Sequence, residues 1–77
     1  MILNGSKLEE IGKALYGEIW VSVLSRRLRR SKRTIMRWRD GSPLPEDLKR
    51  ALVELCDHQL GEIGQYRAAL AEDCLEM

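Results

Sequence analysis

Eight bases and no acid occupy the fourteen residues from Arg26 to Arg39. Apolar residues interrupt this basic block at fold-like spacing, at Leu28, Ile35 and Trp38. A disordered basic tail would lack apolar residues placed in this way. The basic block is therefore predicted to fold, with its apolar side chains in a core and its charged side chains in solvent. Its bases are Arg26, Arg27, Arg29, Arg30, Lys32, Arg33, Arg37 and Arg39.

The rest of the chain balances this charge, since residues 40–77 carry nine acids and three bases and the formal net charge is +1. A face with bases alone is typical of a surface that binds a polyanion, whereas a merely solvated face usually mixes both signs. Seven of the eight bases are arginines, whose planar guanidinium groups suit two-point contacts with phosphate or guanine. The basic block therefore favours contact with nucleic acid over a solvated face.

The length of 77 residues leaves room for one domain with a small core. It excludes a complete cofactor-binding fold and a cleft between domains. Hydrophobic residues make up 44% of the chain, too many for an intrinsically disordered protein. Their spacing predicts an all-α fold, a compact domain of four or five helices. Residues 1–60 are predicted to form this domain and residues 61–77 a helical extension.

Capping residues and glycines divide the first part of the chain into three predicted helices. Ser6 is predicted to cap the first helix and Ser31 the third, because a serine hydroxyl accepts a hydrogen bond from a free N–H group there. Gly17 and Gly41 are expected to end those two helices. The predicted ranges are 7–16, from Glu18 or Trp20 to Leu28, and 32–40.

Beyond a proline-containing loop, Pro45 is predicted to open a further helix, since proline suits the first helical position. Gly61 and Gly64 each lower helix stability, so a break or fraying is expected near them, with one continuous helix as the alternative. Apolar residues in this part of the chain exceed what one small core needs and are predicted to form a dimer interface. They are Leu52, Leu55, Ile63, Tyr66 and Leu70.

Two short helices joined by a tight turn, the second bearing outward bases, describe a helix-turn-helix. Ser25 supplies a small side chain where the two helices would cross, and Leu28, Ile35 and Trp38 are spaced to hold them together. The helical phase of Trp20 and Trp38 predicts that both lie in the core and do not stack on bases.

A wider set of residues shares this joint spacing. It comprises Ala14-Leu15-Tyr16-Gly17, Trp20, Leu24-Ser25-Arg26-Arg27-Leu28, Ser31, Arg33-Thr34-Ile35, Arg37-Trp38, Gly41 and Pro43-Leu44-Pro45. Over these residues the chain resembles small phage and bacterial helix-turn-helix proteins of the repressor/Cro superfamily. The resemblance implies sequence-specific binding of double-stranded DNA and transcriptional control, often repression.

The chain departs from that family at Arg29-Arg30, where the turn usually carries glycine followed by an apolar residue. An arginine in the left-handed conformation is about 1 kcal/mol less favourable than a glycine. The turn is therefore expected to be less regular than the family's, or to use the stem of Arg30 for packing and its charged end for phosphate.

The outward side chains of the third predicted helix are the candidate DNA contacts. The first residues of a recognition helix approach base edges most closely. Base reading is therefore assigned to Lys32, Arg33, Met36 and Arg37. Phosphate contacts are predicted for Arg26, Arg27, Arg29, Arg30, Ser31, Thr34, Arg39 and Ser42.

One helix-turn-helix reads only a few base pairs, so a homodimer on a palindromic operator is expected. The predicted protein is a transcriptional regulator, with repression as the expected outcome. The alternative is a small phage-type inhibitor or adaptor that keeps the helix-turn-helix as a scaffold. Such a protein would bind a protein partner through the acidic C-terminal half.

Catalytic motifs are missing from the sequence, so neither enzyme activity nor a cofactor is expected. Cys56, His58 and Cys74 are three possible zinc ligands, but residues two apart on a helix point about 160° from one another, and no metal site is predicted. Two cysteines, no long apolar run and no charged leader before an apolar block favour a cytoplasmic location without membrane contact.

Overall fold

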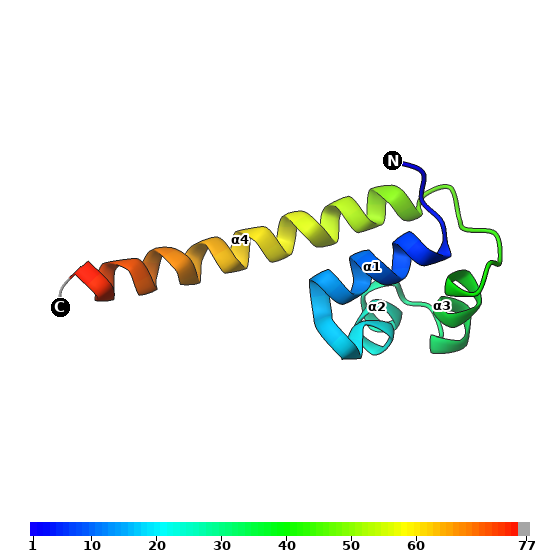
Figure 1. Cartoon of the computed structure of the whole chain (residues 1–77), viewed down its shortest axis with the longest axis horizontal. Coiled ribbons are helices and arrows are strands. Elements are labelled where there is room, and N and C mark those ends of the chain that lie inside the picture. The colour runs from blue at the N-terminus through cyan, green and yellow to red at the C-terminus, as the bar shows by residue number, and fades with distance from the viewer. Residues whose placement is uncertain (76–77) are drawn as a thin grey trace.

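The structure, a computed structural model, describes residues 1–75, and these residues form helices and no strand (Figure 1). The prediction of an all-α chain is confirmed. In chain order the elements are α1 (Gly5–Tyr16), the 3-10 turn η1 (Gly17–Ile19), α2 (Trp20–Leu28), α3 (Lys32–Arg39) and α4 (Leu48–Leu75).

Three helices, α1, α2 and α3, form the compact part of the molecule, which we call the head. They pack around Leu8, Leu24 and Ile35, whose side chains are fully buried. The start of α4 closes the head, because Leu48 and Leu52 lie in the same core. The prediction of four or five helices in one compact domain is therefore wrong, since only three make up the head and most of α4 leaves it.

Beyond the head, α4 projects as a single rod (Figure 1). The molecule measures 52 × 22 × 20 Å, and its radius of gyration is 15.3 Å. A compact chain of this length would have a radius of gyration of about 11.5 Å. Every residue from Leu60 to Cys74 is exposed. We call this part, Leu60–Leu75, the distal segment of α4.

The predicted break near Gly61 and Gly64 is wrong, and the alternative of one continuous helix holds, because α4 runs through both glycines without interruption. Among residues 1–75, no atom outside the helix itself lies within 4 Å of where a Cβ atom would stand at either glycine, so no packing contact forces a bend there. The start of α4 also differs from the prediction. The helix begins at Leu48, whose backbone N–H donates to the carbonyl oxygen of Pro45 at 3.2 Å, and Pro45 precedes the helix within a turn.

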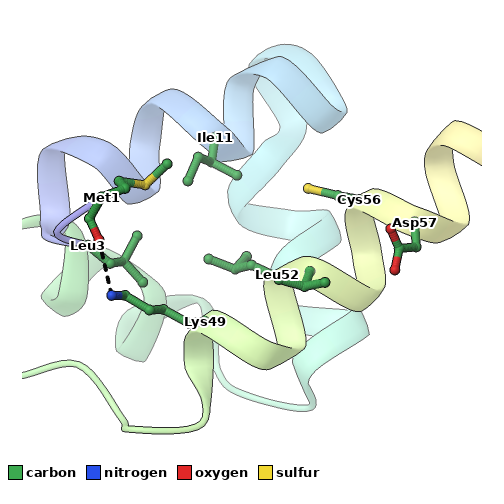
Figure 2. A pocket seen from close by; sticks show the side chains of 8 residues that line it. Met1, Leu3, Ile11, Lys49, Leu52, Cys56 and Asp57 are labelled. Carbon is green, nitrogen blue, oxygen red and sulfur yellow. Dashed lines mark hydrogen bonds between the residues drawn. The ribbon is translucent and has the colours of Figure 1, made fainter.

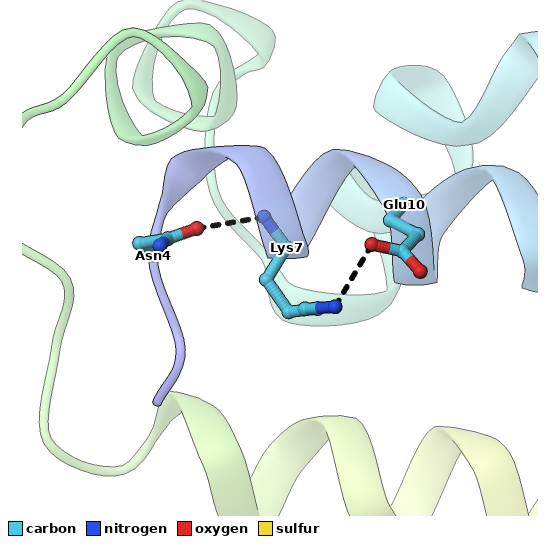
Figure 3. A network of polar contacts seen from close by, with 3 residues as sticks. All are labelled: Asn4, Lys7 and Glu10. Atoms are coloured by element: carbon cyan, nitrogen blue, oxygen red, sulfur yellow. Dashed lines mark hydrogen bonds and ion pairs between the residues drawn. The ribbon is translucent and has the colours of Figure 1, made fainter. Parts of the chain in front are cut away.

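The start of α1 is capped by Asn4, where Ser6 was predicted to do so (Figure 3). The side-chain oxygen of Asn4 accepts a hydrogen bond from the backbone N–H of Lys7 at 2.8 Å. Asparagine caps helices as well as serine does, so the local sequence allowed both positions. The ammonium group of Lys7 also lies 3.0 Å from Glu10, which reinforces the first turn.

Two glycines let α1 approach the other helices closely. A Cβ atom at Gly12 would overlap the indole ring of Trp20, and one at Gly5 would overlap the carbonyl oxygens of Trp38 and Arg39. Trp20 is itself buried, as predicted, so its ring fills the space beside the backbone of α1. The packing of α1 on both α2 and α3 therefore depends on the absence of these two side chains.

We expect the substitution Gly12→Ala to lower the free energy of unfolding by about 1–3 kcal/mol, because the added methyl group must displace a buried indole ring. Equilibrium unfolding in urea, followed by tryptophan fluorescence, measures the change.

Gly61→Ala is the matched control, since the same methyl group enters open space there. It should raise helix content without destabilising the head. A Gly12→Ala protein as stable as the parent would contradict the close approach of α1 and Trp20.

Candidate nucleic-acid interface

The connection between α2 and α3 is a regular three-residue turn. Arg29 adopts the left-handed conformation, with φ 56° and ψ 44°. Its backbone N–H donates to the carbonyl oxygen of Arg26 at 3.4 Å, and that of Arg30 donates to Ser25 at 2.9 Å. This pair of bonds is a Schellman motif, which usually has a glycine at the left-handed position. The turn is thus a regular helix end, and the expected irregularity is wrong, with an arginine in the place that favours glycine.

The start of α3 is capped by Ser31, as predicted. Its hydroxyl oxygen accepts a hydrogen bond from the backbone N–H of Thr34 at 3.1 Å and lies 2.9 Å from the hydroxyl oxygen of Thr34. Both hydroxyl groups, which were predicted phosphate contacts, are therefore joined to one another. A hydroxyl can accept a second bond, so a contact with phosphate would have to share these groups with the cap.

The end of α3 repeats the same closing pattern. Gly41, with φ 115°, donates its N–H to Trp38 at 3.2 Å, and Ser42 donates to Arg37 at 2.9 Å. Gly41 thus ends the helix as predicted. The backbone N–H of Ser42 is used within the chain, so only its exposed hydroxyl group is free for the phosphate contact predicted there.

The two faces of α3 divide as the sequence predicted. Ile35 and Trp38 are buried against α1 and α2. The residues assigned to base reading all lie on the opposite, exposed side: Lys32, Arg33, Met36 and Arg37. None of these four residues is acidic, so the exposed face of α3 carries three bases and one methionine.

Arg39 differs from the other bases because it is paired within the chain. Its Nε lies 2.9 Å from the carboxylate of Asp40. This hydrogen bond, together with the attraction of the Asp40 charge, raises the pKa of Arg39 above its ordinary value. Arg39 is therefore fully charged, but a phosphate would have to compete with Asp40 for its guanidinium group.

The remaining bases of the block lie around the turn and beside α4. Arg29 and Arg30 are exposed, and Arg30 lines a small hollow together with Trp38 and Pro45. Arg26 and Arg27 border a different hollow of about 420 Å³ in the corner between the head and α4. This corner hollow is lined by Tyr16, Val23, Arg26, Arg27 and Gln59.

Gln59 is a contact that sequence reasoning missed. Its side-chain N–H group donates to the carbonyl oxygen of Leu15 at 3.4 Å and so ties α4 to the end of α1. The two residues are 44 positions apart, and no local pattern reveals such a pair. The bond marks the place where α4 leaves the head.

The five residues predicted to form a dimer interface fall into two groups. Leu52 is buried in the core of the head, and Leu55 packs against that core, so the chain's own fold uses both. Ile63, Tyr66 and Leu70 are 54%, 70% and 64% exposed in the distal segment. Only these three are therefore free to contact another molecule.

An apolar groove of about 380 Å³ separates α4 from α1 and the N-terminal residues (Figure 2). The ammonium group of Lys49 donates to the carbonyl oxygen of Met1 at 3.1 Å across one side of this groove. Its lining is Met1, Leu3, Ile11, Lys49, Leu52, Val53, Cys56 and Asp57. The groove suits apolar groups better than phosphate, and it lies apart from the exposed face of α3.

Within residues 1–75, no three His, Cys, Asp or Glu side chains lie close enough together to hold a metal ion. His58 faces Glu62 at 3.5 Å, one turn further along α4, and Cys56 and Cys74 are free thiols. In the same described part of the chain, no helix has an apolar stretch of the length needed to cross a bilayer.

We expect the substitution Arg29→Gly to raise the free energy of unfolding by about 1 kcal/mol, since glycine adopts the left-handed conformation without strain. Urea denaturation of both proteins measures the difference.

Arg30→Gly is the matched control, because it removes the same charge from the same turn at a residue without positive φ. It should bring no such gain. If both substitutions stabilised the protein equally, relief of charge repulsion, and not backbone strain, would be the cause.

The comparisons with known proteins add no relative. The chain matches no protein-family model, no curated protein and no solved structure. The candidate interface therefore rests on the geometry and charge of its own residues.

Proposed function

We propose that this protein is a sequence-specific regulator that binds double-stranded DNA, with α2 and α3 as a helix-turn-helix and α3 as its recognition helix. The observation that carries the proposal is the exposed face of α3, where three bases and one methionine stand together without an acid. An α-helix with such a face fits the width of the major groove of B-DNA.

The electrostatics of α3 support a negatively charged partner. The N-terminus of a helix carries partial positive charge and favours acidic side chains. The first turn of α3 contains no acid and begins instead with Lys32 and Arg33. In the free protein, the partial positive charge at the start of α3 repels the positive charges of Lys32 and Arg33. Phosphate groups bound near the start of α3 would reduce this repulsion.

The contacts divide by position along α3 and the turn. Arg33 and Arg37, one turn apart on the exposed face, are proposed to read guanine, with Lys32 on a base or phosphate and Met36 against a thymine methyl group. Arg29 and Arg30 are proposed to bind phosphate, which gives affinity without sequence information. Arg39 would join them only by leaving Asp40.

The proposed regulator acts in the cytoplasm, as a repressor and as a dimer on a palindromic operator, since one recognition helix reads too few base pairs alone. The competing function is that of an inhibitor or adaptor that binds another protein. The exposed apolar residues of the distal segment favour this second candidate as well as a dimer.

The test is selection from a random library of duplex DNA at about 0.15 M salt, a physiological ionic strength. The parent protein is expected to enrich an inverted repeat. The double variant Arg33→Ala/Arg37→Ala should lose this preference, because each two-point contact with guanine discriminates by about 1–3 kcal/mol.

Lys13→Ala/Arg50→Ala is the matched control, since it removes the same charge from exposed residues of α1 and α4. It should enrich the same sequence as the parent. Failure of the parent to enrich any sequence, with binding that only fades as salt rises, would refute sequence-specific recognition and favour the protein-partner alternative.

A further inference from the structure

The distal segment of α4 carries an uncovered apolar stripe on the same side as the head. Tyr66 follows Leu48 by eighteen residues, and Leu70 follows Leu52 by the same number. Eighteen residues make five full turns of an α-helix, so each pair faces the same direction. Leu48 and Leu52 are buried by the head, whereas Tyr66 and Leu70 remain exposed. One face of α4 is thus covered for half its length and bare for the rest.

The head and the distal segment together form a corner. Figure 1 shows α1 and α2 beneath the first half of α4, with the end of α1 at the edge of the head, where the distal segment projects past it. Gln59 lies at this point and binds the end of α1. The hollow at the corner contains Arg26 and Arg27, so its wall is basic while the stripe above it is apolar.

We propose that a second copy of this chain fills the corner, with the two distal segments packed antiparallel and the acidic end of each α4 against Arg26 and Arg27 of the other copy. Leu60–Leu75 spans about 24 Å, and Asp73 lies near its end, about 20–60° around α4 from Tyr66 and Leu70 and so on the same stripe. When the two segments run antiparallel, that end reaches the other copy's corner. Each copy then offers the same surface to the other, as a two-fold dimer requires.

A parallel pairing has one feature in its favour. Glu62 and Arg67 are five residues apart, a spacing that can form salt bridges across a parallel coiled coil. Exposed ion pairs contribute only about 0.2–1 kcal/mol each. Packed helices lie about 8–10 Å apart, whereas the molecule is 22 and 20 Å across its two shorter axes. Because each head covers the face that would meet the partner, parallel α4 helices would bring the heads into collision.

The antiparallel arrangement avoids this collision because each head lies beyond the end of the other copy's α4. Tyr66 and Leu70 stand near the middle of the shared length, so they pack against the same residues of the second copy. The interface is small, since about three large apolar side chains per copy supply its core. We therefore expect a dissociation constant of about 1–100 μM, a weaker dimer than standard-size interfaces form.

This inference rests on the proposed function, which already includes a dimer, and deepens it by naming the surface through which the two copies meet; assembly is measured without DNA, so the two are tested separately. It also takes Arg26 and Arg27 out of the set of phosphate contacts, since the second copy's Asp73 would occupy them. A failure to form the dimer leaves recognition by α3 untouched, and a failure to bind DNA leaves the dimer untouched.

The first test is analytical ultracentrifugation of the full chain from about 1 μM to about 1 mM, the range over which such a dimer forms. Tyr66→Ser/Leu70→Ser should weaken the dimer at least about tenfold, a change of about 1.4 kcal/mol. The unfolding midpoint of the head should not change, because both side chains are exposed in the monomer.

Val53→Ser is the control for loss of an exposed apolar side chain. Val53 is 58% exposed but lies about 100–140° around α4 from Tyr66 and Leu70. It should leave the dimer unchanged. A parent chain that stays monomeric over the whole range, or a dimer that Val53→Ser weakens as much as the double variant, overturns the proposal.

The second test is a charge exchange. Arg27→Glu should weaken the dimer about fivefold, and Asp73→Arg should do the same, because attraction becomes repulsion in each. The protein that carries both substitutions should recover the parent's dissociation constant. A dimer indifferent to the exchange, or one that the combined protein does not restore, overturns the contact between the acidic end and the corner.

The third test fixes the direction of the helices. In a chain with Cys56→Ser and Cys74→Ser, the pair Arg27→Cys/Asp73→Cys should form disulfide-linked dimers under mild oxidation. Either new cysteine alone should link in much lower yield. Rapid linkage through Cys74 alone, in a Cys56→Ser chain, would instead show that the two helices run parallel.

Discussion

The contact between α1 and its two neighbours holds the head together. Gly12 lets the indole ring of Trp20 lie on the backbone of α1, and Gly5 brings the start of α1 against the last carbonyl groups of α3. Side chains in both places would separate the helices that enclose Leu24 and Ile35. The exposed face of α3 is thus supported from behind by a helix in close backbone contact, which gives an interface the rigid base it needs.

The α2–α3 turn and the start of α3 both depart from the residue types that their local structure favours. In both, the residue that replaces the favoured type is positively charged. An arginine occupies the left-handed position of the α2–α3 turn, where glycine is more stable. Two bases begin α3, where the helix dipole favours acids. Natural proteins tend to break local rules at functional sites. Arg29, Lys32 and Arg33 do so within five residues, which supports the proposal that this surface binds a negatively charged partner.

Sequence reasoning succeeded where neighbouring residues decide the structure. The cap at Ser31, the end of α3 at Gly41 and the burial of Ile35 and Trp38 follow from spacing within one helix. It failed where distant parts of the chain decide. Whether α4 is interrupted at Gly61 and Gly64 depends on whether other residues pack against them. The hydrogen bond of Gln59 with Leu15 depends on how α4 crosses α1. The choice of Asn4 over Ser6 as the cap of α1 is likewise not decided by local preference, since both residue types cap helices well.

The uninterrupted path of α4 through Gly61 and Gly64 has a thermodynamic consequence. An isolated helix of the length of the distal segment is marginal in water, and each glycine lowers its stability by about 1 kcal/mol relative to alanine. Nothing in the described chain covers this segment, so its backbone opens far more readily than that of the head. Any molecule that binds the helical form increases the helical fraction of the distal segment by mass action. The helix content of this protein is then a property of its surroundings as much as of its sequence.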